Sequence, residues 1–203
     1  DLGPNETILI EPGAMSRMSS NLNSSFQRQG GFFSAMFRKM FGGESFFLGK
    51  YEHPDGGKLT FAPSVPGSVQ HYQLSNNSIN IMAGAFLACT PGVSVKAKFG
   101  GFKALFSGEG AFLLEVSGNG DLFFNSFGGI VEKEINGDFI VDTGHVVAFE
   151  PSLTYKISGM GNWKSTMLSG EGLVMTFRGT GKIYLQTHTL DGIASWLTPR
   201  LLG

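Results

Sequence analysis

Apolar and polar residues alternate along most of the chain, in short runs that end at glycine-containing turns. Alternation with a period of two is the pattern of a strand with one buried face, and strands at roughly eight- to twelve-residue spacing are typical of all-β proteins. The strongest hairpin signals are Asn136-Gly137 and Asp55-Gly56-Gly57, because tight hairpin turns need the positive φ that glycine adopts easily. The pattern predicts an all-β protein of linked antiparallel units.

One stretch of this pattern occurs three times. An apolar run, a polar residue, a proline and a small residue are followed by alternating positions, around Pro12, Pro91 and Pro151. A glycine–glutamate pair and a further strand-like run follow each copy, and the distance from proline to glutamate is longer in the first copy. Self-similarity of this kind indicates a repeat architecture, with units at about residues 5–75, 76–135 and 136–190.

Three units that cannot bury their apolar faces alone are expected to pack together around a pseudo-threefold axis and to share an apolar centre. The sequence therefore predicts one domain over residues 1–203, similar to a β-prism. It also predicts two short helices. One lies in an insertion at about residues 20–42, and the other covers about residues 191–201, with Asp191 as its N-cap ahead of Pro199.

Composition narrows the class of protein. Apolar residues make up 41% of the chain and charged residues 15%, which excludes a disordered chain. The formal net charge of −1 makes nucleic-acid binding an unfavoured interpretation. With Cys89 as the single cysteine, no intrachain disulfide can form. Since no signal peptide and no apolar run long enough to span a bilayer is recognisable, we expect a cytoplasmic protein.

Several segments resemble a known family. They are residues 43–47 (GESFF), 107–110 (SGEG), 169–174 (SGEGLV), 141–149 (VDTGHVVAF) and 183–187 (IYLQT). Together they resemble the bacterial and mitochondrial family named for altered inheritance of mitochondria, number twenty-four. The resemblance implies a fold similar to that of the tryptophan RNA-binding attenuation protein, and a connection with membrane organisation. It supplies no catalytic residues.

The repeated glutamates are candidate metal ligands. If Glu44, Glu109 and Glu171 point at a common axis, their carboxylates could hold a hard cation such as Ca²⁺. The favoured alternative is that each carboxylate accepts backbone N–H bonds at its own turn, because like charges held close together are costly without a cation. No cofactor is expected.

No pattern typical of an enzyme is present. The histidines are isolated from one another in the sequence, and Cys89 lies in an apolar run, where a buried and unreactive thiol is expected. No nucleophile–base pair or paired-acid arrangement can be identified. We therefore expect a protein that is not an enzyme.

The insertion is a candidate contact surface. Residues 17–50 hold five basic residues against one acidic residue. Five apolar side chains fall at helical spacing on one face, and two basic residues lie between them; the seven residues are Phe33, Met36, Phe37, Arg38, Lys39, Met40 and Phe41. A short basic amphipathic helix can lie on an anionic membrane or dock on a partner. The favoured alternative is a lid over the β-core or over a neighbouring subunit.

These observations favour a non-catalytic structural or protein-interaction protein that forms homo-oligomers and has a connection with membrane organisation. Low charge and an abundance of phenylalanine, with 19 residues, favour buried contacts between subunits. The alternative is a small-ligand binding module with a cavity within or between the β-units.

Overall fold

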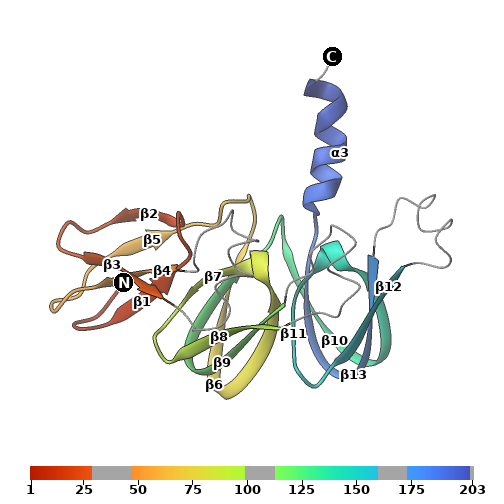
Figure 1. The fold of residues 1–203 in the computed structure, drawn as a ribbon, viewed down its shortest axis with the longest axis horizontal. Helices are drawn as coiled ribbons and strands as arrows, with labels where there is room; N and C mark the ends of the chain where they lie inside the picture. Colours follow the sequence, from red (N-terminus) through yellow and green to blue (C-terminus); the bar gives the residue numbers. More distant parts are fainter. Residues whose placement is uncertain (29–46, 99–112, 160–172, 202–203) are drawn as a thin grey trace.

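The computed structural model describes residues 1–28, 47–98, 113–159 and 173–201. These residues form three groups of strands that lie side by side in a row, from the N-terminal group at one end to the C-terminal group at the other, with one helix rising from the last group (Figure 1). The predicted all-β class is confirmed.

The elements follow one another in three sets. The first set is β1 (Thr7–Ile10), β2 (Met15–Met18), β3 (Asn23–Arg28), β4 (Phe47–Glu52) and β5 (Leu59–Phe61). The second is β6 (Val69–Met82), the 3₁₀ turn η1 (Ala83–Ala85), β7 (Phe86–Cys89), β8 (Val93–Lys98) and β9 (Leu113–Asn125). The third is β10 (Ile130–Asp142), the 3₁₀ turn η2 (Thr143–His145), β11 (Val146–Phe149), β12 (Thr154–Gly159) and β13 (Leu173–Gln186), followed by helix α3 (Leu190–Leu201). We call these sets unit 1, unit 2 and unit 3.

Eleven strands form one sheet in the order β10-β13-β11-β6-β9-β7-β1-β4-β3, with β12 beside β13 and β8 beside β9. Strands β2 and β5 form a second, two-stranded sheet. The large sheet ends at β10 on one side and at β3 on the other, so it is not closed among the described residues, and they do not show the expected pseudo-threefold axis. The expected unit limits at residues 75/76 and 135/136 fall inside β6 and β10.

The pairing registers reveal which strands correspond between units. Strand β2 pairs with β5, β7 with β9 and β11 with β13, each time with one register shift at the same place in the short strand. Strand β2 is therefore the counterpart of β7 and β11. The predicted equivalence of the three prolines is wrong for Pro12, which lies between β1 and β2, whereas Pro91 and Pro151 follow β7 and β11. Threonine 20 stands where the other units have proline.

A repeated hydrogen bond explains the polar residue that precedes these positions. In each unit its side-chain oxygen accepts a bond of 2.9 Å from a backbone N–H of the facing strand or turn; the acceptors are Ser19, Thr90 and Glu150, and the donors are Lys58, Asp121 and Lys182. Backbone donors at a strand crossing need such partners when they are shielded from water. The repeat thus conserves a hydrogen-bonding role with three different side chains.

The long strands bend sharply in the middle (Figure 1). Gly137, which the hairpin signal assigns to a turn, instead lies inside β10 opposite Gly179, and both have positive φ. The Asn136-Gly137 hairpin prediction is therefore wrong, because glycine serves here to curve a continuous strand. Gly56, with φ +74°, does lie in the turn between β4 and β5 as predicted.

The apolar core is divided into three clusters rather than gathered at one shared centre, which corrects that expectation. The largest cluster runs from Leu9 through β6 and β9 to Tyr184, and so joins all three units. A second surrounds Phe149 and Phe177 in unit 3, and a third surrounds Ile8 and Ile10 in unit 1. Apolar burial therefore links neighbouring units in a row.

The predicted C-terminal helix is confirmed as α3, with two corrections. Its N-terminal cap is Thr189, whose side-chain oxygen accepts a hydrogen bond from Gly192 N–H (3.1 Å), whereas Asp191 lies in the first turn. Pro199 lies inside the helix instead of after it. Of the insertion predicted at about residues 20–42, residues 23–28 form strand β3, and the rest lies outside the described residues.

Candidate functional site

The units meet at two junctions of the same construction. At the first, β1 pairs with β7; at the second, β6 pairs with β11. The paired residues Leu9, Cys89, Ile81 and Ala148 have no exposed surface. We call these contacts the unit junctions. They are the most deeply buried contacts between parts of the chain that are far apart in sequence.

A small cavity lies at the second junction, where η1 and η2 come together. Its volume is about 190 Å³, and its lining is mainly apolar, with Met82, Val146 and Leu190 among the lining residues. Typical small-molecule pockets are roughly 300–1,000 Å³, so this cavity is small for a ligand site. The buried hydroxyl of Thr143 beside it already donates to Leu173 O at 2.7 Å. The alternative of a small-ligand module stays a prediction.

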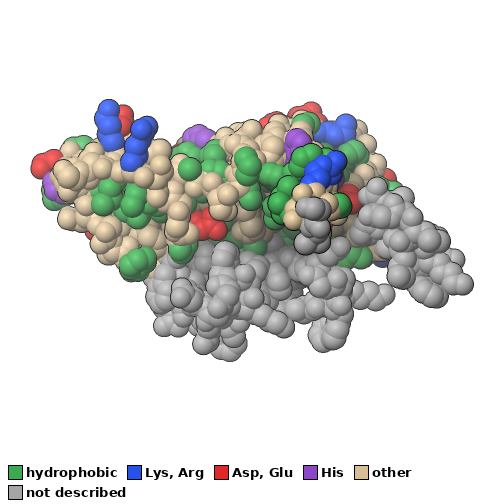
Figure 2. Space-filling model, turned by 90° about the horizontal axis from the view of Figure 1, so that it is seen from above, with side chains coloured by type: hydrophobic (Ala, Val, Ile, Leu, Met, Phe, Trp, Pro, Cys, Tyr) green, Lys and Arg blue, Asp and Glu red, His purple; other side chains and the backbone are tan. Residues whose placement is uncertain are grey.

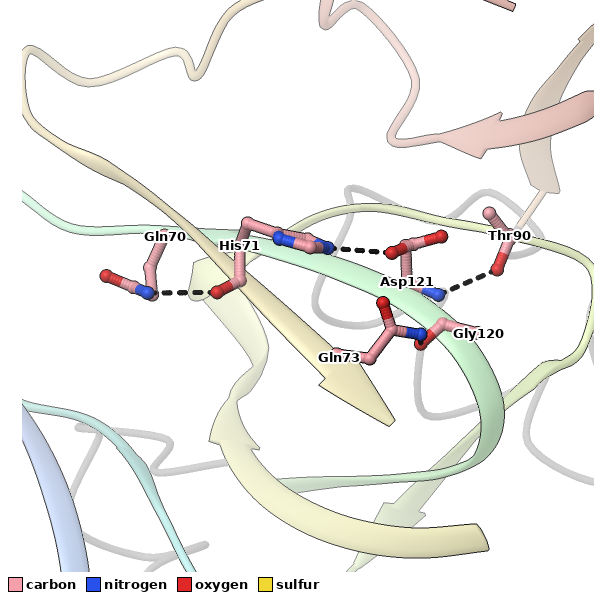
Figure 3. Close-up of polar contacts among 6 residues, drawn as sticks. All are labelled: Gln70, His71, Gln73, Thr90, Gly120 and Asp121. Atoms are coloured by element: carbon pink, nitrogen blue, oxygen red, sulfur yellow. Dashed lines mark hydrogen bonds and ion pairs between the residues drawn. The ribbon is translucent and has the colours of Figure 1, made fainter. Parts of the chain in front are cut away.

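A histidine–aspartate pair lies on the outer face of unit 2. His71 Nε2 is 2.7 Å from Asp121 Oδ1, and the ring of His71 stacks on Phe123 with centroids 5.0 Å apart. Figure 3 shows the pair, with Thr90 on the other side of Asp121, where its hydroxyl accepts the Asp121 N–H. The Thr90 oxygen is thus engaged with the backbone and does not face the imidazole.

The same position in unit 3 indicates what this pair does. Glu132 stands opposite Tyr184 as His71 stands opposite Phe123. Its carboxylate lies 2.6 Å from Lys182 Nζ, in the place of the His71–Asp121 contact. Two polar pairs of unlike composition therefore join the same two strands, as cross-strand pairs on one face of a sheet commonly do. This repetition favours a structural role for His71 over a catalytic one.

The remaining histidines and the cysteine also have structural surroundings. His145 Nδ1 is 2.7 Å from Gln186 O, and His53 Nδ1 accepts Asp55 N–H at 3.1 Å. Cys89 is fully buried, as predicted, and burial raises the pKa of its thiol to about 12. A thiol in this environment is protonated at neutral pH and is a poor nucleophile.

Glu11 is a partly buried carboxyl beside the first junction. It follows β1, and its backbone N–H donates to Leu87 O at 2.8 Å. Burial raises the pKa of the Glu11 carboxyl from 4.5 to about 7. The folded protein therefore binds a proton here more tightly than the unfolded chain does.

Replacing Glu11 by glutamine should change how stability depends on pH. Below pH 4.5 the carboxyl is protonated in both states, and its contribution to stability is then largest. As the pH rises from 4.5 to about 7, the unfolded chain loses the proton first, so stability falls. We expect Glu11→Gln to remove this fall and to be more stable than the wild type above pH 7. Urea unfolding at several pH values measures it; parallel profiles for the two proteins would contradict it, and Glu134→Gln, an exposed carboxyl, is the control.

Helix α3 presents an unusual surface. None of its residues is buried. Its large apolar side chains fall on one side of the helix; they are Leu190, Ile193, Trp196, Leu197 and Leu201. The Arg200 guanidinium lies 4.3 Å from the Trp196 ring centre. Figure 2, seen along the helix, shows hydrophobic side chains gathered around it. The sequence predicts the helix, but its separation from the core follows only from the structure.

The other predicted site residues are not tested by the fold. Glu44, Glu109 and Glu171 lie outside the described residues, as do the insertion residues Phe33, Met36, Phe37, Arg38, Lys39, Met40 and Phe41. Within the described ranges, no three His, Cys, Asp or Glu side chains gather in a way that could hold a metal ion. The glutamate and insertion hypotheses therefore stay predictions.

A family model described as "Mitochondrial biogenesis AIM24" matches residues 1–188. The chain belongs to the AIM24 family. The match ends just before α3 begins at Leu190. The family resemblance of the sequence motifs is thereby confirmed, and it extends over all three units of this AIM24 chain.

Two relatives place this AIM24 protein further. An uncharacterised protein of Streptococcus pyogenes serotype M6 is 32% identical over 206 residues, which cover 97% of this chain and 83% of that protein. The crystal structure of the protein SPYM3_0169 from Streptococcus pyogenes has a TM-score of 0.80 and 30% identity, covering 98% of this chain and 91% of that one. Neither relative bears on the expected likeness to the tryptophan RNA-binding attenuation protein, which stays a prediction. Among the helices that the structure describes, none is long and apolar enough to cross a membrane.

Proposed function

We propose that this AIM24 protein is a non-catalytic structural or protein-interaction protein that assembles with copies of itself. The observation that carries the proposal is the open sheet. Its end strands β10 and β3 each have one paired neighbour in the described structure, and each exposes an apolar side chain, with Ile140 63% and Phe26 79% exposed. Unpaired strand edges are templates for pairing with another chain.

The finer fold features belong to the same proposal. Three units of like register, with a leftover edge at each end, would be related by a pseudo-threefold arrangement if the edges were satisfied. The predicted likeness to the ring-forming tryptophan RNA-binding attenuation protein would then concern assembly. A fold-level likeness does not imply the same ligand, and the proposal includes no nucleic acid.

Light scattering over a dilution series tests self-association. We expect a mass that is a multiple of 21.8 kDa at high concentration and falls on dilution. A mass of 21.8 kDa at every concentration would contradict the proposal. Circular dichroism of the same samples verifies that dilution does not unfold the chain.

The second candidate is peripheral contact with a membrane through α3. Trp196 is 55% exposed and lies over Arg200, and amphipathic rings beside basic side chains are favoured at membrane interfaces. Flotation of the same preparation with anionic liposomes separates the two candidates. Binding that Trp196→Gln abolishes and Ser195→Gln retains supports the membrane candidate, and failure of the wild type to float removes it.

A further inference from the structure

The two unit junctions follow one rule. In each unit a strand leads into a short turn, and another strand follows that turn. The leading strands are β1, β6 and β10, and the following strands are β2, β7 and β11. At the first junction the leading strand of unit 1 pairs with the following strand of unit 2, and at the second junction the leading strand of unit 2 pairs with that of unit 3 that follows its turn.

The registers of the two junctions are the same. Leu9 stands opposite Cys89 and Ile10 opposite Ala88. Asn80 stands opposite Phe149 and Ile81 opposite Ala148. The following strands β7 and β11 correspond residue by residue, because both pair with the next long strand through one register shift at the same position. The chain therefore builds one specific strand-to-strand contact twice.

One leading strand and one following strand lack this contact. In the described structure β10 pairs only with β13, and β2 pairs only with β5. By the junction rule these two strands are partners for each other. Ile140 occupies the position of Leu9 and Asn80, and Met18 occupies the position of Cys89 and Phe149.

Burial shows the consequence of the missing neighbours. Residues 8–10 and 79–81 of the paired leading strands are buried, whereas the matching residues 139–141 are partly or largely exposed. Strands β7 and β11 are buried at all four positions, whereas β2 is exposed at all four. Both surfaces still carry apolar side chains, since Ile140, Met15 and Met18 are exposed large hydrophobic residues. The sequence thus supplies two matching half-junctions.

We propose that β10 of one chain pairs with β2 of a second copy in the register of the unit junctions, with Ile140 opposite Met18 and Val141 opposite Arg17. This inference rests on the proposed self-association and names its interface. The partner is a second copy because β2 lies in the unit at one end of the row and β10 in the unit at the other end (Figure 1). Each pairing leaves one free β2 and one free β10, so assembly is head-to-tail and forms rings or open chains.

The chemistry of β2 makes this junction more polar than the internal ones. Arg17 stands in the place of Ala88 and Ala148, and its Nε donates to Thr60 Oγ1 at 3.1 Å. Thr60 in turn replaces the larger rings of unit 2 and unit 3. Permanent subunit interfaces are more hydrophobic than reversible ones, so this contact is reversible. A charged side chain on the edge also limits pairing with strands that do not fit it.

Cysteine cross-linking tests the register. Glu11 N–H donates to Leu87 O at 2.8 Å, so the adjacent pair Ile10–Ala88 is of the non-hydrogen-bonded kind. Its proposed counterpart is Val141–Arg17. Cα atoms of such a pair lie about 4.5 Å apart, which suits a disulfide. Two single variants, Arg17→Cys and Val141→Cys, are mixed and oxidised; the buried Cys89 does not compete.

We expect covalent dimers in the mixture and none in either variant alone. Dimers of Val141→Cys alone would show that β10 pairs with itself, and absence of dimers in the mixture would show that the register is wrong; both outcomes overturn the inference. In the double variant, an intrachain disulfide without dimers would also overturn it. The control mixture of Arg17→Cys with Val131→Cys, an exposed position near the other end of β10, should stay unlinked.

Light scattering of the reduced samples separates this inference from the proposed function. Association without the mixed dimer leaves self-association standing and removes the β10–β2 contact, whereas a monomer at every concentration removes both. Ile140→Lys should weaken association by about tenfold or more, and Val131→Lys should leave it unchanged. Equal effects of the two lysine variants would contradict the proposed interface.

Discussion

Replacing Phe149 by alanine should lower the free energy of unfolding by about 3–5 kcal/mol, as for other fully buried aromatic side chains. Phe149 has no exposed surface, and its ring lies edge-on against Phe177 and Tyr155 at centroid distances of 5.0 and 5.2 Å. It also stands opposite Asn80 in the second unit junction. The truncation therefore opens a cavity in the unit 3 core and at the contact with unit 2. Urea or guanidinium unfolding measures the loss.

The matched control is Phe26→Ala, because Phe26 is a phenylalanine on an edge strand with 79% of its surface exposed. Surface substitutions usually change stability by no more than about 0.5 kcal/mol. Equal losses for the two variants would contradict the placement of Phe149 in the core. Both should be compared at one low concentration, so that self-association does not enter the difference.

The second large effect is expected at Gly118, where two stretches of backbone cross. Gly118 has φ +128°, and a Cβ atom built there would lie 2.3 Å from Gly92 O. The partner glycine is equally close, since a Cβ on Gly92 would lie 2.2 Å from Asn119 O. Alanine at Gly118 meets both a disfavoured backbone angle and a backbone atom that cannot move alone. We expect Gly118→Ala to lose about 2–4 kcal/mol of stability in denaturant unfolding.

Gly137→Ala separates the two causes. Gly137 has φ +110°, and nothing lies within 4 Å of the position that its Cβ would take. This variant carries the backbone cost without the steric one, so its loss should be nearer about 1 kcal/mol. If both variants lost the same amount, the close approach of Gly92 and Gly118 would not matter to stability.

The sequence patterns predict the fold class and α3 because these depend on local signals. Alternation indicates strands, and the apolar run between Thr189 and Pro199 indicates a helix. Register between units is less accessible. The proline motif draws Pro12 into line with Pro91 and Pro151, yet the hydrogen-bonding position before the proline is what the units share, filled by Ser19 in unit 1. Unlike side chains in one role leave little trace in a sequence.

The same limit applies to the candidate sites. An Asn-Gly pair looks the same in a hairpin and in a bent strand, and only the pairing of Gly137 with Gly179 distinguishes them. The two half-junctions are visible in sequence as ordinary apolar strands. Their meaning depends on which neighbours are present, which is a property of the whole sheet. Exposure of Ile140 and Met18 could be interpreted only after the paired counterparts were identified.

Helix α3 has twelve residues and no buried side chain. A helix of that length is marginal in water unless other parts of the structure support it. A partner that binds the helical form must therefore draw on the helical fraction of an equilibrium, and its apparent dissociation constant is the intrinsic one divided by that fraction. Residues on the polar side, such as Ser195 and Thr198, thereby tune the affinity of the apolar side through helix propensity, without touching the partner.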